Sequence, residues 1–327
     1  MPQLITTSVV RGSHQGESHG GVYLIDIEGN EILKPVDWNT LDIDWSGRGW
    51  DRGLRGIAFH NGKIIIAASD MLLFFDQQFN IVDSFSNKYL KHCHELSIHG
   101  DHLFATSTGY DSILGFNLTT KEFDWGLTIV SRGTLFGCKR FDPRADDGPL
   151  LLNKMHINNV FCDQGGMYIS GRRTKALLRF DGEKVSVMTT LPLGVHNARP
   201  YRGGVFFNDT EGDSVRFEDP NVRRAWRIPK FAEHKLTHTD IDDTKIARQG
   251  FARGLCIIDE GHFAVGSSPS TVSIYNMEKQ RPNQVANLSL DIRNAIHGLS
   301  LWPYQLLISR QLQNLNLACL ILQQLEY

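Results

Sequence analysis

The sequence predicts an all-β chain that folds as one six-bladed β-propeller domain over residues 1–327. Three observations carry this prediction. Short apolar runs alternate with Gly, Asp and Asn, whereas helical periodicity is scarce. One layout of three strands recurs five times, and a sixth copy is divided between the two ends of the chain. Repeated sheets of this kind, arranged around an axis, form the blades of a propeller.

The first strand of each copy is an apolar stretch that ends in a tight turn. The five first strands cover residues 55–60, 94–99, 156–161, 196–201 and 253–258. The turns are Asn61-Gly62, Gly100-Asp101, Gln164-Gly165-Gly166, Arg202-Gly203-Gly204 and Glu260-Gly261. Successive first strands begin 39, 62, 40, 57 and 44 residues apart, near the ~40–50 residues of a blade.

The second and third strands complete each copy. Second strands are expected at 63–67, 103–106 and 167–170, and third strands at 113–116, 176–180 and 272–275. The sixth copy has its first strand at 297–302 and its other two at 4–9 and 21–26. Pairing the N- and C-terminal strands in one blade would close the ring and remove its open edges.

The two long steps between first strands indicate insertions. Residues 131–154 and 233–249 each lead into a first strand, so both are expected on the same face of the disc. Residues 306–327 fit no blade and are treated as a possible C-terminal extension, either a strand or a short helix.

Composition narrows the function classes. The net charge of -2 gives no support for nucleic acid or an anionic membrane as the main partner. No apolar run is long enough to span a bilayer. The five cysteines, Cys93, Cys138, Cys162, Cys256 and Cys319, are widely spaced, so free thiols and a cytoplasmic location are expected. Phosphate-loop, Rossmann and nucleophile-elbow motifs are missing from the sequence.

The first position of the inner strands carries the main functional signal. Around the ring it holds Arg55, His94, His156, His196, Arg253 and His297. Histidine makes up only 13 of 327 residues, so four at six equivalent positions is a coincidence on the order of 1 in 10,000. Inner strands line the channel of a propeller. We therefore expect these side chains to converge at the axis.

The residue types at these positions suggest a metal centre. His94, His156 and His196 lie on consecutive blades and His297 lies opposite His156, so the four are the predicted ligands of a divalent transition metal, with Fe²⁺ or Mn²⁺ favoured. Arg55 and Arg253 would act as catalytic residues that bind the carboxylate, phosphate or sulfate of a substrate. Histidines without metal, forming a cationic anion pocket, are the competing interpretation.

Other residues are weaker candidates. His14 and His19 lie in a glycine-rich loop on the face where first strands begin, and Arg199 follows a ring position; all three are predicted to bind substrate. A solvated loop is the alternative for the two histidines. Glu95 is expected to pack, or to orient a neighbouring histidine. The loop residues His92, Asp111, Arg172, Arg173 and Asp209 are expected to shape the access of substrate to the channel.

The blade pattern resembles six-bladed propellers of the NHL and gluconolactonase-like type over nearly the whole chain. Those lactonases hold calcium with Glu, Asn and Asp, whereas this ring carries histidines and arginines. The histidine ring resembles the four-histidine iron centre of carotenoid-cleaving oxygenases. It is also similar to propeller lyases that use histidine-bound manganese and an arginine against uronate carboxylates.

These observations predict a metal-dependent enzyme, of lyase or oxygenase type, acting on a small anionic substrate in the channel. The metal would polarise a carboxylate or carbonyl for β-elimination, or bind dioxygen beside the substrate. The alternative is a propeller that binds a protein or an anionic ligand without chemistry. An anion-binding hydrolase without metal is the least favoured of these functions, because neutral histidine would be its only available general base. The oligomeric state is not predictable from these features.

Overall fold

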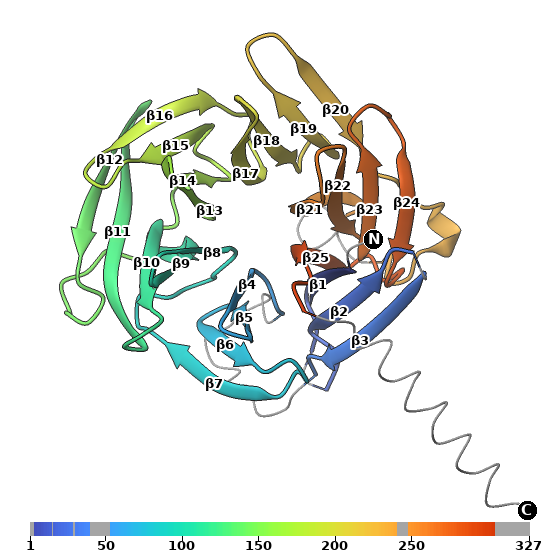
Figure 1. The fold of residues 1–327 in the computed structure, drawn as a ribbon, viewed down its shortest axis with the longest axis horizontal. Coiled ribbons are helices and arrows are strands. Elements are labelled where there is room, and N and C mark those ends of the chain that lie inside the picture. Colours follow the sequence, from blue (N-terminus) through green and yellow to red (C-terminus); the bar gives the residue numbers. More distant parts are fainter. Residues whose placement is uncertain (1–2, 15, 29, 40–52, 241–247, 305–327) are drawn as a thin grey trace, which may run out of the picture.

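Six antiparallel sheets surround a common axis (Figure 1). The computed structural model describes residues 3–14, 16–28, 30–39, 53–240 and 248–304. Within these ranges the only helices are two short 3₁₀ turns, η1 (Thr108–Tyr110) and η2 (Glu233–Lys235). The predicted all-β, six-bladed propeller is confirmed. The suggested extension at 306–327 lies outside the described residues.

The blades are numbered along the chain. Blade 1 consists of β25 (Asn294–Leu301), β1 (Gln3–Val10), β2 (Gly20–Asp26) and β3 (Glu31–Asp37). Blade 2 consists of β4 (Ile57–His60), β5 (Lys63–Ala68), β6 (Met71–Phe75) and β7 (Ile81–Ser86). Blade 3 consists of β8 (Leu96–His99), β9 (His102–Ser107), β10 (Ser112–Asn117), β11 (Glu122–Arg132) and β12 (Leu135–Phe141).

The remaining blades have four strands each. Blade 4 consists of β13 (Ile157–Asp163), β14 (Gly166–Gly171), β15 (Ala176–Phe180) and β16 (Val185–Thr190). Blade 5 consists of β17 (Val195–Tyr201), β18 (Gly204–Asp209), β19 (Ser214–Glu218) and β20 (Arg223–Arg227). Blade 6 consists of β21 (Gly250–Ile257), β22 (His262–Ser268), β23 (Thr271–Asn276) and β24 (Pro282–Asn287).

Blade 1 joins strands from both ends of the described chain. Strand β25 pairs with β1 in antiparallel register, with Leu301 opposite Leu4 and Asn294 opposite Val10. The three predicted strands of each copy correspond to the inner three strands of a blade. Each blade also has an outer fourth strand, whose mixed polar sequence gives a weaker signal because one of its edges faces solvent.

The first insertion extends blade 3. Part of it forms the β11–β12 hairpin, in which Arg132 pairs with Leu135, so this sheet has five strands. The chain then runs through residues 142–155 to His156. In the second insertion, residues 241–247 lie outside the described part of the chain.

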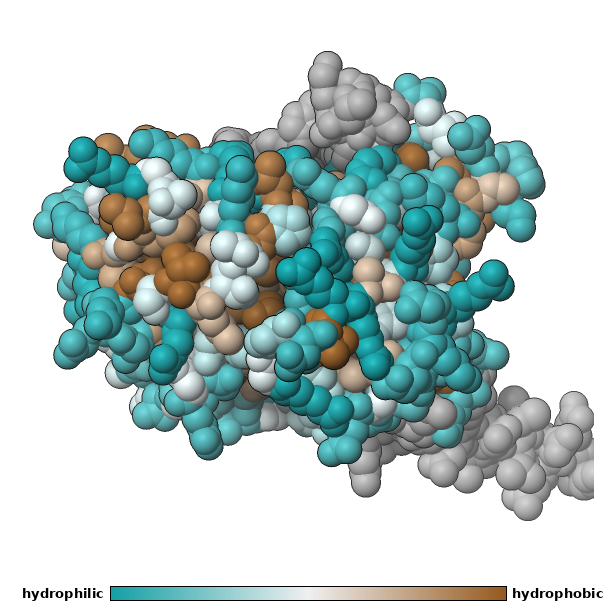
Figure 2. Space-filling view, turned by 90° about the horizontal axis from the view of Figure 1, so that it is seen from above, coloured by the Kyte–Doolittle hydropathy of each residue, from teal (hydrophilic) through white to brown (hydrophobic). Residues whose placement is uncertain are grey.

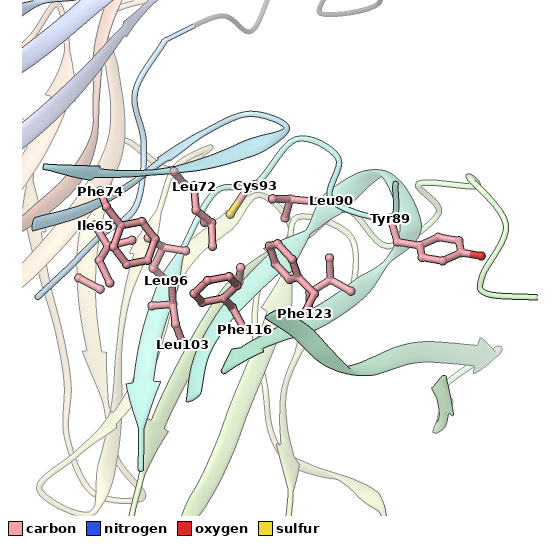
Figure 3. Packing of buried hydrophobic residues seen from close by; sticks show 14 residues of the cluster. Ile65, Leu72, Phe74, Tyr89, Leu90, Cys93, Leu96, Leu103, Phe116 and Phe123 are labelled. Atoms are coloured by element: carbon pink, nitrogen blue, oxygen red, sulfur yellow. The ribbon is translucent and has the colours of Figure 1, made fainter. Parts of the chain in front are cut away.

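The core lies between neighbouring blades. Successive side chains of a strand point to opposite faces, so Ile64 and Ile66 of β5 pack toward blade 1, whereas Ile65 packs against Leu103 and Phe116 of blade 3 (Figure 3). Both faces of the inner strands are therefore buried. This accounts for their continuous apolar runs, since each fully buried aliphatic side chain contributes roughly 1.5–3 kcal/mol.

Some apolar side chains remain on the outside. Figure 2 views the disc from its edge and shows them on the side where β12 and β16 lie in Figure 1. The exposed apolar side chains of the outer strands include Val130, Leu135, Val187 and Met188. In the described ranges, no helix has both the length and the apolar character needed to cross a bilayer.

Candidate functional site

The six predicted ring residues lie at one end of the inner strands. His196, Arg253 and His297 are in β17, β21 and β25. Arg55, His94 and His156 lie just before β4, β8 and β13. The inner strands of neighbouring blades contact one another around the axis (Figure 1). The residues that follow the ring positions line one cavity, which places the ring positions together at the other end of the channel.

Irregular backbone marks this level of the channel. The pairing register shifts between Ile157 and Asn159, between His196 and Arg199, and between Arg253 and Leu255. The pairing of β25 with β1 shifts at the same level, opposite Thr6 and Ser8. Such bulges bend a strand locally and change the direction of a side chain.

His94 and His196 are held in the same way in two different blades. The Nδ1 of His94 lies 2.7 Å from the carbonyl oxygen of His92 and 2.9 Å from Thr108 Oγ1. The Nδ1 of His196 lies 3.0 Å from the carbonyl oxygen of Gly194 and 2.9 Å from Thr210 Oγ1. A carbonyl oxygen can only accept a hydrogen bond, so Nδ1 carries the proton in both rings.

The two threonines connect each histidine to the next blade. Thr108 donates its hydroxyl proton to the Ile157 carbonyl at 2.6 Å, and Thr210 donates to the Ala252 carbonyl at 2.7 Å. Their Oγ1 atoms therefore accept from the imidazoles. The lone pair of each ring is left on Nε2, and in His196 this nitrogen is buried without a hydrogen-bond partner. A histidine that donates Nδ1–H to a carbonyl or hydroxyl oxygen is the usual form of a metal ligand.

His156 is positioned by a different set of contacts. Its Nδ1 lies 3.0 Å from Asn153 Oδ1, and its backbone has a φ of 56°. The carboxylate of Asp111 accepts hydrogen bonds from the backbone N–H groups of Met155 and His156, at 3.1 and 2.8 Å. Asp111 was expected to shape the access of substrate, but here its oxygens hold the turn that places His156.

His297 is paired with an arginine. Arg253 Nη1 lies 2.8 Å from His297 Nε2. The same Nη1 lies 3.4 Å from Nδ1 of this ring. Since a guanidinium only donates, the shorter contact makes Nε2 the accepting nitrogen of His297. In this arrangement the Nε2 lone pair of His297 is engaged by Arg253, which differs from the predicted role of His297 as a fourth metal ligand. Arg253 also lies over the ring of Phe251, 4.5 Å from its centroid.

Arg55 lies between blades, with no exposed surface. Its Nη1 donates to the carbonyl oxygen of Cys93 at 3.4 Å. Burial raises the pKa of the Cys93 thiol to about 12, so this cysteine stays protonated at neutral pH. A protonated thiol does not neutralise the Arg55 guanidinium. The positive charge of Arg55 lowers the pKa values of His94 and His297.

The buried imidazoles are neutral at physiological pH. Burial, followed by the charge of Arg55, holds the pKa of His94 well below its usual range. Burial and the charge of Arg253 do the same for His196 and His297. Neutral imidazole is the form that binds a metal ion.

The rings lie near one another without converging on one point. The ring centroid of His94 is 5.4 Å from that of His156 and 6.0 Å from that of His297. Imidazoles sharing an ion at ~2.0–2.1 Å have centroids ~5–6 Å apart. However, within the described residues no three His, Cys, Asp or Glu side chains form a group that could hold a metal ion as they stand. The spacing of His94 and His156 is thus compatible with a shared ion, although the side chains as they stand do not form such a group.

Three predicted substrate-binding residues lie away from the ring. His14 is exposed in its loop, where its backbone N–H donates to Glu17. His19 has no exposed surface, and its Nδ1 lies 2.6 Å from Ser13 Oγ, so it does not overhang the channel. Arg199 lies three residues beyond His196, toward the other end of the channel. The tertiary structure thus separates Arg199 from Arg55 and Arg253.

A polar layer follows the histidines along the axis. The carboxylate of Glu95, on blade 3, accepts a hydrogen bond from Asn197 Nδ2, on blade 5. Asn197 Oδ1 in turn accepts from Asn208 Nδ2 at 3.0 Å and from Gly254 N–H at 2.9 Å. Burial raises the pKa of Glu95 to about 7. The hydrogen bond between Glu95 and Asn197 therefore joins blades 3 and 5 next to the histidines. This polar layer lies between the histidines and the other end of the channel.

Several residues of the site were not anticipated. Thr108 and Thr210 each follow their histidine by 14 residues, a spacing that is visible in the sequence once the blades are aligned. Arg11 and Arg248 lie 4.3 and 5.3 Å from the ring centroid of Phe251. Arg11 follows the strand β1 of blade 1 and Arg248 precedes the strand β21 of blade 6, so the two are far apart in the sequence and share no motif that would predict their proximity.

Neither a protein-family model nor a curated protein matches this sequence. Among solved structures, a protein of unknown function from Bacteroides caccae is similar, with a TM-score of 0.56 and 9% identity over 93% of this chain and 100% of that chain. A chain of the nidogen/laminin complex has a TM-score of 0.55 and 9% identity over 92% of this chain and 98% of that chain. The structure of U3-55K has a TM-score of 0.47 and 11% identity over 72% of this chain, which spans 64% of that chain's length. The first two similarities show the propeller fold alone.

Proposed function

We propose that this propeller is a metal-dependent enzyme that acts on a small anionic substrate at the histidine end of its channel. The observation that carries the proposal is the matched anchoring of His94 and His196. Two blades use the same carbonyl and threonine contacts to fix Nδ1–H, which leaves Nε2 as the lone-pair nitrogen. Burial without a metal would leave the Nε2 of His196 without a partner, at a cost of about 1–3 kcal/mol.

The chemistry of the neutral imidazoles suits a first-row divalent metal, although a small movement of the side chains would be needed to bring them together. His94, His156 and His196 would hold it, with Fe²⁺ or Mn²⁺ favoured. Such an ion would supply Lewis-acid polarisation of a substrate oxygen for an elimination, or redox chemistry with dioxygen. His297 contributes differently, because its Nε2 accepts from Arg253. It positions that guanidinium beside the imidazoles.

The arginines define the substrate class. Arg55 and Arg253 place two permanent positive charges next to neutral imidazoles, and Arg11 and Arg248 add two more around Phe251. A guanidinium fork binds a carboxylate, phosphate or sulfate through two parallel hydrogen bonds. The chemistry is therefore directed at an acid group, or at the carbon next to one.

Elemental analysis by mass spectrometry tests this proposal. Protein purified without a histidine tag should contain close to one iron or manganese per chain. A His94→Ala/His156→Ala variant should lose it, whereas a His60→Ala/His99→Ala control at the opposite turns should retain it. Wild-type protein that stays metal-free after incubation with Fe²⁺ and Mn²⁺ would overturn the proposal.

A second candidate is a non-catalytic pocket for an anionic ligand. The Arg253–His297 hydrogen bond favours it, because it removes one of the four nitrogens from metal coordination. In that case an anion such as sulfate should bind equally well before and after treatment with a chelator. Loss of sulfate binding on chelation would support the metal-dependent function instead.

A further inference from the structure

The channel has a second chamber at the end away from the histidines. It is a cavity of about 370 Å³ lined by the inner strands of all six blades. Its walls come from residues that follow the ring positions along each strand, such as Leu96, Val160 and Leu299. The Glu95–Asn197 layer separates it from the imidazoles. Cavities of roughly 300–1,000 Å³ are the usual size for small-molecule sites.

The chamber wall combines polar groups with apolar side chains. Phe59, Leu96, Ile98, Phe161 and Leu255 are among the side chains that line it. Removing a hydrocarbon surface from water against such walls contributes roughly 25 cal/mol per Å². An occupant with an apolar body can pack against these side chains.

Arg199 contributes a positive charge to the chamber wall. The guanidinium of Arg199 lies over the Phe161 ring, 5.7 Å from its centroid, and its Nη2 donates to the Leu255 carbonyl at 3.3 Å. Its Nε is buried without a hydrogen-bond partner. The other charged residue of the lining, Glu95, instead accepts from Asn197. Arg199 therefore keeps most of its donors for a ligand.

We propose that this chamber is a second binding site, for a small organic acid with an apolar body whose carboxylate is bound by Arg199. A carboxylate matches the fork of a guanidinium and neutralises one charge. A polyphosphate or a dianion would leave uncompensated charge, because Arg199 is the one cationic residue among those that line the chamber, and an unpaired buried charge is costly. This inference does not rest on the proposed metal chemistry, since no ring histidine lines the chamber.

Hexanoate and its neutral counterpart hexan-1-ol are suitable probes. We expect wild-type protein treated with a chelator to bind hexanoate with a Kd on the order of 1 mM by calorimetry. Hexan-1-ol should bind at least ~10-fold more weakly, because it cannot pair with the guanidinium. Equal affinity for the two probes, or no binding of hexanoate, would overturn the proposal without using any variant.

Two charge-removing variants locate the site. Arg199→Met should weaken hexanoate binding by at least ~10-fold and leave hexan-1-ol binding unchanged. Arg202→Met is the matched control, since Arg202 lies three residues further on and pairs with Glu260 at 3.5 Å, at the surface. If both variants weaken hexanoate equally, the effect is general electrostatics and the proposal fails. Metal content is unaffected by either result, so this test and that of the proposed function fail separately.

Discussion

The two ends of the channel are built from neighbouring residues of the same inner strands, yet one end is filled by side chains and the other encloses a cavity. At one end, His94 and His196 are anchored through two contacts each, and backbone and side chains fill the surroundings. Further along the same strands, Leu96 and Arg199 border a cavity. The difference teaches that one propeller channel can hold a preorganised polar site and a separate cavity, divided by one layer that consists of the Glu95 carboxylate and the Asn197 and Asn208 carboxamides.

The largest effect is expected from removing the threonines that hold the imidazoles. Thr108→Val and Thr210→Val should each lower the affinity for Fe²⁺ or Mn²⁺ by about 10–100-fold, since contacts behind a metal ligand have effects of this size. Affinity is measured by competition with a chelator, after circular dichroism has established that each variant folds. Thr119→Val, on an exposed turn, is the control. Affinity that is unchanged in both variants would mean that the matched anchoring serves stability alone.

Adding a methyl group tests how tightly the histidine end of the channel is packed. In Gly298→Ala, the added Cβ would meet the Arg55 carbonyl oxygen and lie 2.7 Å from Thr7 Oγ1. We expect the free energy of unfolding to fall by about 2–3 kcal/mol, as for other overpacked sites. Gly137→Ala, whose Cβ would meet Val130 at 3.4 Å, should change stability little. Chemical denaturation measures both, and equal effects would show that the ring region yields to extra volume.

Arg248, which lies over Phe251, is held by the carboxylate of Asp213, and the contribution of this carboxylate to the free energy of unfolding should vary with pH. Asp213 accepts from Lys230 at 2.9 Å, from the Phe251 N–H at 3.2 Å and from Arg248. These bonds outweigh burial and hold the pKa of Asp213 below 3.8. Because the folded pKa is lower than the unfolded one, the contribution of Asp213 is complete above pH 3.8 and is lost as pH falls through the folded value.

Asp213→Asn should therefore lower the free energy of unfolding by about 2 kcal/mol at pH 7. The difference from wild type should shrink in denaturation experiments below pH 3.8. Asp146→Asn, at a fully exposed carboxylate that pairs with Lys88, is the control and should have little effect at either pH. A pH-independent deficit in Asp213→Asn would show that its charge is not what holds Arg248.

The smallest effect concerns the charge around His297. Burial and the Arg253 charge lower the pKa of this imidazole. Arg253→Met should raise the pKa, because it removes the second cause and the hydrogen bond to Nε2. Titration followed by NMR of the imidazole nitrogens measures the change. Arg199→Met, at the other end of the channel, should leave the pKa of His297 where it is, and an equal rise in both variants would deny that the two ends are separate.

Much of the fold was predictable because the repeat is local. The turns after each first strand and the apolar runs around them place strands such as β5, β9 and β14 correctly. The ring positions follow from the same alignment, since equivalent residues of repeated blades meet at the axis. The outer fourth strands were not predicted, because a polar edge strand has no strong periodicity.

The sequence by itself determined the propeller, the number of its blades and the set of residues at the histidine end. Only the tertiary structure decided the role of each. The folded backbone brings the His92 carbonyl to Nδ1 of His94 and so fixes its tautomer. Packing of the blades pairs Arg253 with His297, buries His19 and places Arg199 in a separate chamber. The physical reason is that strand order follows from local patterns, whereas bulges and hydrogen bonds between distant residues, such as Glu95 and Asn197, 102 positions apart, set the direction of each side chain.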